Sequence, residues 1–186
     1  MLLLTGCGWT GGGFRPDGQE MPRLRQVLAL EAGKVVADVG AGEGELTLAL
    51  AREVGWVYAT EIDAGRLKKL HAAKPRNVTV VEASSGETGL PPGCCDAIVL
   101  RRVYHHLTDP ASVNASLLRA LRPGGVLAVV DFPPPFFWGR GSLGVPAAAV
   151  VAEVASSGFE MIRLIDDWPG RGPLQSYCAV FRKPRL

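Results

Sequence analysis

The sequence predicts an α/β fold with a mostly parallel sheet, helices on both of its faces, and an antiparallel hairpin at one edge. Short apolar runs rich in valine and isoleucine alternate along the chain with longer segments in which apolar residues have helical spacing. This alternation is typical of parallel strands joined by helices. The final two apolar runs, 159–165 and 176–182, have no helical segment between them, so we expect them to pair antiparallel.

Helix boundaries are clearest in the first half of the chain. Pro22 falls in the first turn of the first expected helix, where its missing N–H costs nothing, and Gly55 stops the second helix. The third helix ends before Pro75, because the residue before a proline disfavours the helical conformation. Apolar β-rich runs between the helices predict buried strands. The expected elements are helices at 20–31, 45–54 and 64–73 and strands at 34–39, 56–62 and 77–81.

Loops divide the second half of the chain. The stretch "EASSGETGLPPG" is a loop by composition, "RPGG" (122–125) is a turn signal that closes a helix, and the proline-rich stretch "FPPPFFWGRGSLG" breaks regular structure. Gly158 stops the last helix. The expected elements are strands at 96–100, 126–131, 159–165 and 176–182 and helices at 110–121 and 145–157.

Bulk composition limits the classes of partner. The chain has 186 residues, of which 47% are apolar and 20% charged, and its net charge is +2. This balance predicts one globular domain and gives no reason to expect a nucleic-acid partner or a membrane surface. No apolar run reaches the ~18 residues of a membrane helix, so no span is expected. The four cysteines, Cys7, Cys94, Cys95 and Cys178, contain no Cys-x-x-Cys pair, which predicts reduced thiols and no metal site.

The N-terminal region is expected to lie outside the domain. Residues 1–19 are glycine-rich and predict a flexible lead-in, whereas residues 20–186 form the domain. The stretch "LLLTGC" resembles the end of a bacterial lipoprotein signal, but no basic segment precedes it and three leucines are too few for a signal core. We therefore expect a cytoplasmic protein. The alternative is an exported lipoprotein modified at Cys7, if the sequence has lost an upstream piece.

A glycine-rich loop marks the expected ligand site. Gly40, Gly42 and Gly44 follow the first strand and open directly into a helix. Glycine allows positive φ and close approach of the backbone, and the free N–H groups of a helix start favour an anion. A dinucleotide fingerprint would place its third glycine at position 45, which is Glu45, so a nicotinamide-dependent oxidoreductase is disfavoured. The loop instead fits a pyrophosphate-free ligand with a carboxylate.

An acidic residue ends the second strand. Glu61 lies 17 positions beyond Gly44 and can accept hydrogen bonds from both hydroxyls of a ribose. The nearby Asp63 is instead expected to cap the helix that begins at Ala64. The glycine loop and Glu61 together predict a nucleoside attached to a carboxylate-bearing group.

Four ordered blocks resemble class I S-adenosylmethionine-dependent methyltransferases. They are "VADVGAGEGELTLALA", "VYATEID", "LPPGCCDAIVLRRVYHHLTDP" and "LRPGGVLAVVDF", and "SYCAVFRK" resembles the family's last antiparallel strand. The resemblance spans roughly residues 20–183. It implies a Rossmann-like three-layer sandwich with a seven-stranded, mostly parallel sheet and an antiparallel C-terminal edge hairpin. It also implies S-adenosylmethionine as the cofactor.

The resemblance assigns roles to individual residues. The loop residues Gly40, Ala41, Gly42 and Gly44 would contact the methionine part of the cofactor, and Asp38 would orient the loop or reach the amino group through water. Glu61 would hold the ribose, with Ile62 beside it and Arg101 at the end of the fourth strand. Family members commonly carry an aspartate in the loop that frames the adenine. Here the loop has none, so Ser85, Glu87 or backbone groups are the alternatives for that contact.

The candidate catalytic residues follow the fourth strand, beside the expected methyl group. Histidine is a plausible base near neutral pH, although methyl transfer from an activated donor does not require one. Consecutive side chains in a helical turn point about 100° apart, so His105 and His106 cannot face the same atom. We expect Tyr104 and His105 to line the cleft and His106 to be structural. The alternative is that the histidines cap or pack the turn.

The predicted function is methyl transfer to a small-molecule acceptor, whose identity and methylated atom the sequence leaves open. The chain has little beyond the expected core, which favours a small acceptor over a macromolecule. A protein or RNA methyltransferase and a non-catalytic S-adenosylmethionine-binding protein are the alternatives. The oligomeric state is also open.

Overall fold

The computed structural model describes residues 19–134, 144–169 and 175–185. Residues 1–18 of the expected lead-in (1–19), with Cys7 among them, lie outside the described residues. The helices are α1 (Glu20–Leu28), α2 (Glu45–Leu50), α3 (Ala64–Ala73), the 3₁₀ helix η1 (Tyr104–His106), α4 (Pro110–Ala120) and α5 (Ala147–Ser156). The strands are β1 (Val35–Val39), β2 (Trp56–Glu61), β3 (Val78–Glu82), β4 (Cys95–Arg101), β5 (Leu121–Asp131), β6 (Glu160–Trp168) and β7 (Ser176–Arg182).

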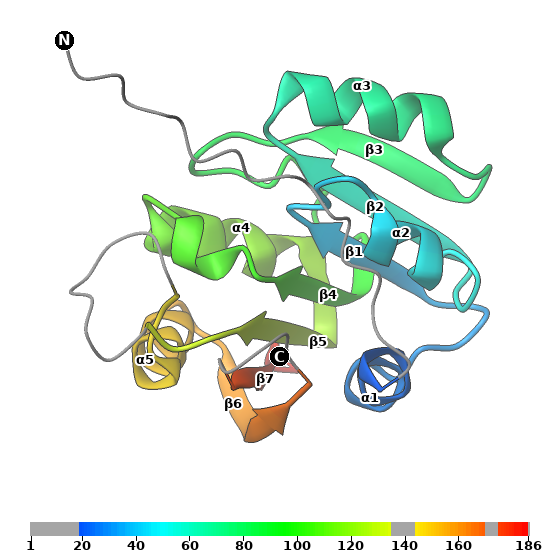
Figure 1. Ribbon diagram of the computed structural model, residues 1–186. Helices are drawn as coiled ribbons and strands as arrows, with labels where there is room; N and C mark the ends of the chain where they lie inside the picture. The colour runs from blue at the N-terminus through cyan, green and yellow to red at the C-terminus, as the bar shows by residue number, and fades with distance from the viewer. Residues whose placement is uncertain (1–18, 135–143, 170–174, 186) are drawn as a thin grey trace, which may run out of the picture.

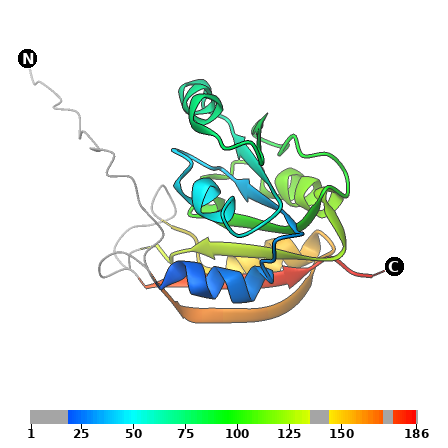
Figure 2. The same ribbon diagram turned by 90° about the vertical axis from the view of Figure 1, so that its right-hand side faces the viewer.

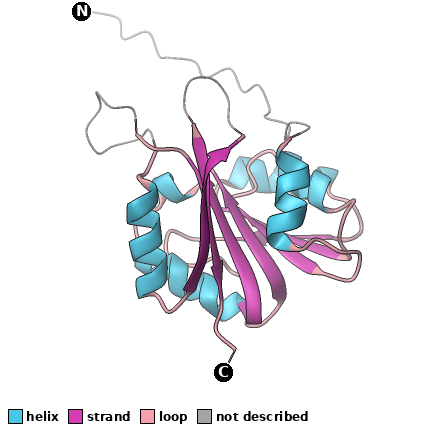
Figure 3. Ribbon diagram, turned by 90° about the horizontal axis from the view of Figure 1, so that it is seen from below, coloured by secondary structure: helices cyan, strands magenta, loops and turns pink. Residues whose placement is uncertain are grey.

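One seven-stranded sheet runs through the described part of the molecule, in the order β3-β2-β1-β4-β5-β7-β6. The first five strands pair in parallel, whereas β7 pairs antiparallel with both β5 and β6. Helices cover both faces of the sheet, which gives three layers (Figures 1 and 3). The predicted fold class, including the antiparallel hairpin at the edge, is confirmed.

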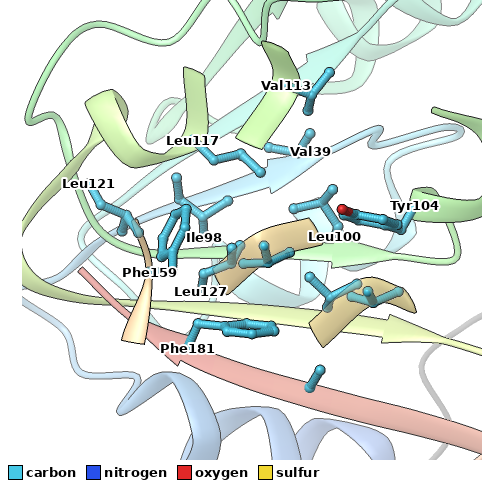
Figure 4. Close-up of a cluster of buried hydrophobic side chains, with 14 of the residues drawn as sticks. Val39, Ile98, Leu100, Tyr104, Val113, Leu117, Leu121, Leu127, Phe159 and Phe181 are labelled. Carbon is cyan, nitrogen blue, oxygen red and sulfur yellow. The ribbon is translucent and has the colours of Figure 1, made fainter. Parts of the chain in front are cut away.

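Two apolar cores lie on opposite faces of the sheet. One joins α4 and α5 to β4, β5 and β7, and its members include Leu117, Ile98 and Phe181 (Figure 4). The other joins α1 and α2 to the same central strands and includes Leu24 and Leu50. Figure 2 shows α1 lying along the sheet over β5, β7 and β6. The central strands are therefore buried on both faces, which explains why their sequences read as continuous apolar runs.

Several boundaries differ from the expected ones, and α1 and α2 end three and four residues early. Strand β5 begins at Leu121, so the "RPGG" turn signal falls inside the strand, and the pairing with β4 shifts between Cys95 and Ala97 to absorb it. Strand β6 continues to Trp168 because it keeps pairing with β7. The short helix η1 was not expected, since three residues are too few to show a period. No helix among the described residues is long and apolar enough to cross a membrane.

The strand order reverses between β1 and β4, because the chain runs outward to β3 and then returns past β1. Ligands of such sheets bind beside the carboxyl ends of the strands at the point of reversal. The loops after β1, β2, β3 and β4 meet at this place.

Candidate functional site

A pocket of about 700 Å³ opens at the carboxyl ends of the parallel strands, at the point of reversal. This volume suits a cofactor-sized molecule. The loops after β1, β2, β3 and β4 form its wall. Among the predicted cofactor residues, the ones that line it are Gly40, Gly42, Glu61, Ile62, Ser85, Glu87 and Arg101.

The glycine loop is folded tightly onto β2. The backbone N–H groups of Gly40 and Ala41 both donate to the carbonyl of Thr60, at 3.0 and 2.8 Å. Gly40, Gly42 and Gly44 all have positive φ, at 74°, 58° and 84°. Glycine adopts this conformation without the steric cost that other residues meet. The loop therefore presents bare backbone to the pocket and ends directly at α2.

Gly40 also faces a close neighbour across the sheet. A Cβ at this position would lie 2.5 Å from Cγ2 of Val103, which follows β4. A Cβ at Gly42 would meet nothing within 4 Å. Both the positive φ and the close packing against Val103 thus require a glycine at position 40. No pattern in the sequence predicted this contact with Val103.

Glu61 is a buried carboxylate fixed by backbone amides. Its Oε2 accepts from the N–H of Gly42 at 2.8 Å, and its Oε1 accepts from Ile62 at 2.8 Å and Asp63 at 3.1 Å. A carboxylate offers about four acceptor positions, so three are used within the protein. The side chain is only 4% exposed, and it lines the pocket directly below the glycine loop. It is therefore held in place before any ligand arrives.

Asp38, Ala41 and Gly44 lie outside the pocket lining. Asp38 is buried beneath the loop, where it accepts a 2.6 Å hydrogen bond from Oγ1 of Thr47 in α2. Burial raises the pKa of Asp38 to about 6. This contact ties the end of β1 to the first turns of α2, which supports the orienting role expected for Asp38. A Cβ at Gly44 would lie 2.6 Å from Leu70 of α3, so this glycine also meets a packing limit.

The adenine side of the pocket is formed by the loop after β3. Ser85 and Glu87 both line the pocket. Glu87 is exposed and already forms an ion pair with Arg119 of α4, at 2.5 and 2.7 Å. Thr88 anchors the loop through a 2.7 Å hydrogen bond with Ser116. The contact with adenine therefore stays a prediction for Ser85, Glu87 or the loop backbone. Glu87 would have to bind adenine while it is paired with Arg119.

Arg101 lines the pocket, but its charged group is already paired with a carboxylate of the protein. Its guanidinium forms an ion pair with Glu20 of α1, with N–O distances of 2.9 and 3.0 Å. Glu20 is fully buried and also accepts from Nε1 of Trp168 at 3.3 Å. Buried charges are tolerated when paired in this way. Arg101 therefore fastens α1 to the end of β4 at the edge of the pocket.

Tyr104 does not line the pocket, which corrects the expectation from the sequence. It is 2% exposed and belongs to the core under α4 and α5 (Figure 4). Its hydroxyl donates to Oε2 of Glu153 at 3.0 Å and accepts from Nδ2 of Asn114 at 2.9 Å. Burial raises the pKa of the phenol. A phenol with these partners serves to join η1, α4 and α5.

The two histidines have exchanged the expected roles, because His106 and not His105 lines the pocket. The side chain of His105 is 6% exposed, and its Nδ1 lies 2.9 and 3.0 Å from the two carboxylate oxygens of Asp131. His106 lines the pocket instead, with its ring 3.9 Å from that of His105. Burial, with a smaller effect of His105, lowers the pKa of His106. The physical reason is that Asp131 binds both the backbone N–H and the ring of His105, so the next side chain of this short helix, which leaves in a different direction, faces the pocket.

Asp131 was missed by the sequence reasoning as a residue of the site. It ends β5 and is fully buried, and it accepts from the backbone N–H groups of His105 at 3.1 Å and Phe132 at 2.9 Å. It therefore holds η1 against the end of β5 through both the backbone and the ring of His105. The available signal was an acidic residue that ends a buried strand, as Glu61 ends β2, while Asp38 lies one residue before the end of β1.

The substitution Tyr104→Phe tests whether the hydroxyl of Tyr104 stabilises the fold or takes part in the reaction. We expect Tyr104→Phe to lower the free energy of unfolding by about 1–3 kcal/mol, because the buried Asn114 and the half-buried Glu153 both lose a partner. Cofactor affinity should stay within twofold of wild type. Urea unfolding and calorimetry measure the two quantities, with Tyr58→Phe at a half-buried position as the control. If the variant is as stable as wild type but has lost activity, Tyr104 has a catalytic role after all.

The reversal of strand order, the glycine loop and the fixed acid after β2 define the class of protein. This is the fold of class I methyltransferases, enzymes whose methyl donor is S-adenosylmethionine. Such a donor fits the groups of this site, which offers bare loop backbone for a carboxylate-bearing end and a buried carboxylate for ribose hydroxyls.

Comparison with known proteins gives the family. The family model described as "Methyltransferase domain" matches residues 37–129, which is half of the chain. The chain belongs to this methyltransferase domain family. The matched segment extends from β1 to β5 and contains the glycine loop, Glu61 and η1.

Two curated relatives resemble part of the chain. An uncharacterized methyltransferase of Mycobacterium tuberculosis is 36% identical over 103 residues, covering 54% of this chain and 51% of the relative. The ubiquinone/menaquinone biosynthesis C-methyltransferase UbiE of Marinomonas sp. is 32% identical over 114 residues, covering 57% of this chain and 45% of the relative. The chain thus spans about half the length of the curated relatives it matches.

A solved structure shares the fold over nearly its whole length. The S-adenosylmethionine dependent methyltransferase from Mesorhizobium loti superposes with a TM-score of 0.74 at 18% identity, covering 89% of this chain and 98% of the other. At this identity the likeness concerns the fold, so the chemistry has to be argued from the site.

Proposed function

We propose that this protein binds S-adenosylmethionine and transfers its methyl group to a small-molecule acceptor. The observation that carries the proposal is Glu61, a buried carboxylate held by three backbone amides at the wall of the pocket and facing the bare glycine loop. This pairing suits a ligand with ribose hydroxyls at one end and a carboxylate at the other. The cofactor, when bound, supplies an electrophilic methyl group on a sulfonium.

The protein's own contribution is mainly to align two molecules. Holding reactants in the productive geometry can contribute roughly 7–11 kcal/mol to lowering a barrier. The glycine loop and Glu61 fix one side of the pocket, whereas Val103, His106 and Leu107 form its wall after β4. The acceptor is proposed to bind beside this second wall.

A small acceptor is supported by the pocket and by one group of relatives. The pocket, at about 700 Å³, lies within the range of sites that bind small molecules, and Val103, His106 and Leu107 line it beside the expected cofactor residues. Relatives named ubiquinone/menaquinone biosynthesis C-methyltransferase act, by that name, in quinone biosynthesis. A small, ring-containing acceptor methylated on carbon is the corresponding proposal for this chain.

Calorimetry with S-adenosylmethionine and with NAD tests the central claim. We expect saturable binding of S-adenosylmethionine and none of NAD, because the loop departs from the dinucleotide fingerprint at Glu45. Absence of S-adenosylmethionine binding by folded protein would overturn the proposal. A screen of acceptors that follows methyl transfer would then distinguish an enzyme from a binding protein.

His106 is the residue we propose to accept a proton when the acceptor must lose one. It lines the pocket, and burial keeps its pKa below the ordinary value of 6.5, so it is neutral at pH 7. We expect His106→Gln to lower turnover at least tenfold while cofactor affinity stays within twofold. Turnover by wild type should fall as the pH drops below 6.5, because protonation removes the base, and the variant should lose this dependence.

The substitution His105→Ala is the matched control for His106→Gln, because we expect it to act on the fold around the pocket and not on the proton transfer. It contacts Asp131 and not the pocket, so His105→Ala should lower turnover by loosening η1 and should also lower the free energy of unfolding. Turnover should still fall at acid pH, with the fall moved toward higher pH because His105 no longer lowers the pKa of His106. Equal turnover of wild type and His106→Gln with an acceptor that must be deprotonated would remove His106 from the reaction.

A further inference from the structure

Two neighbouring cysteines bring their sulfurs together at the end of the sheet opposite the pocket. Cys94 lies in the loop before β4, and Cys95 is the first residue of the strand. Their Sγ atoms are 3.0 Å apart. Consecutive side chains of an extended strand point to opposite faces, so this approach requires the irregular backbone at the start of β4. The pairing with β5 is indeed irregular there, between Cys95 and Ala97.

The two thiols differ in exposure. Cys94 is half-buried and reaches the surface, whereas Cys95 is fully buried in the core under α4. The hydrogen bond from Cys95, helped by the positive charge of Arg122, lowers the pKa of Cys94. The same contact, together with burial, raises the pKa of Cys95. Cys94 is thus the accessible thiol, the one of the two that ionises more readily, and Cys95 is the buried thiol in contact with it.

We propose that Cys94 and Cys95 form a peroxide-reactive dithiol, in which Cys94 is oxidised first and Cys95 closes a disulfide between neighbouring residues. The Cys94 thiolate attacks one oxygen of hydrogen peroxide, the O–O bond breaks, and a sulfenic acid and hydroxide form, the hydroxide taking up a proton to become water. The sulfur of Cys95 then attacks the sulfenic sulfur, and its proton leaves with the departing oxygen as a second water. Two thiols are oxidised and one peroxide is reduced to two waters.

The second step needs only a small shift of the sulfurs, but consecutive Cα atoms, about 3.8 Å apart, are closer than the roughly 4.4–6.8 Å usual in disulfides, so the bond formed is strained and readily reduced. Disulfide sulfurs lie about 2.05 Å apart, so the two atoms, now 3.0 Å apart, must approach by about 1 Å. A resolving thiol next to an accessible one is the usual arrangement of reversible cysteine oxidation. Cys178 provides the internal contrast, because it is fully buried in β7, where burial raises its pKa to about 12.

This site does not depend on the proposed methyltransferase function. The length of β4, from Cys95 to Arg101, separates the thiols from the pocket. At about 3.3 Å per residue this is on the order of 20 Å. Oxidation should therefore leave cofactor binding unchanged, and either proposal can fail alone.

Peptide mass analysis of the whole protein after stoichiometric hydrogen peroxide tests the proposal. Trypsin cleaves after Arg76 and Arg101, and the peptide between them contains Cys94 and Cys95 as its only cysteines. We expect this peptide to lose the mass of two hydrogen atoms and to regain it on reduction. Cys178 should stay alkylatable after denaturation.

Two substitutions separate the roles of the thiols. With Cys95→Ser, Cys94 should accumulate a sulfenic acid that dimedone traps, whereas Cys94→Ser should leave Cys95 unmodified. Cys95→Ala replaces the first variant if serine is poorly tolerated in the core. An unchanged wild-type peptide, or a wild-type product in which Cys94 is overoxidised or joined to another chain, would overturn the proposal.

Discussion

Replacement of Glu61 by alanine is expected to weaken binding of S-adenosylmethionine at least tenfold, about 1.4 kcal/mol. The substitution removes the acceptor proposed for the ribose hydroxyls. It also leaves the amides of Gly42, Ile62 and Asp63 without the carboxylate that they contact at 2.8 to 3.1 Å. Glu61→Gln keeps the shape of the side chain and should cause a smaller loss, because one oxygen acceptor remains. Calorimetry measures the affinity, and thermal unfolding shows whether each variant is folded.

Glu43→Gln is the matched control for Glu61. Glu43 lines the same pocket, but it is 52% exposed and pairs with Lys69 at 3.1 Å. A solvent-screened carboxylate contributes little, so affinity should change less than twofold. If Glu61→Ala binds as tightly as wild type, or if both variants lose affinity equally, Glu61 is not the specific ribose contact.

Gly40→Ala is expected to have the largest effect on stability. An alanine in the left-handed conformation costs roughly 1–2 kcal/mol, which Gly42→Ala should show alone because its Cβ meets open space. At Gly40 the added Cβ would lie 2.5 and 2.9 Å from the two methyl carbons of Val103. We therefore expect Gly40→Ala to lose about 3 kcal/mol or more, given the further cost of overpacking. Urea unfolding without ligand measures both losses.

A double-mutant cycle with Val103→Ala isolates the contact. Removing the methyl groups of Val103 should recover part of the Gly40→Ala loss but none of the Gly42→Ala loss. Additive effects of Gly40→Ala and Val103→Ala would show that backbone strain alone explains the change.

Much of the fold could be predicted because its signals are local. The alternation of strands and helices, the glycine loop and the missing helix before β7 are all written in short stretches of sequence. The side of the pocket expected to bind the cofactor could be predicted from the same stretches. Gly40, Gly42 and Glu61 lie where strands end, and the loops that follow parallel strands meet at one edge of the sheet. The strand boundaries at the start of β5 and the end of β6 were not predicted, because they depend on pairing with a distant strand.

The sequence by itself determined the class of fold, the place of the pocket and the acid that faces the glycine loop, because each depends on the order of elements along the chain. Only the tertiary structure decided which residue of η1 faces the pocket. Asp131, 26 positions after His105, fixes the rotation of that short helix, so that Tyr104 enters the core, His105 meets the carboxylate and His106 lines the pocket. Contacts over such a separation leave no periodic pattern in the sequence, since the direction of a side chain from a single turn is set by what packs against it.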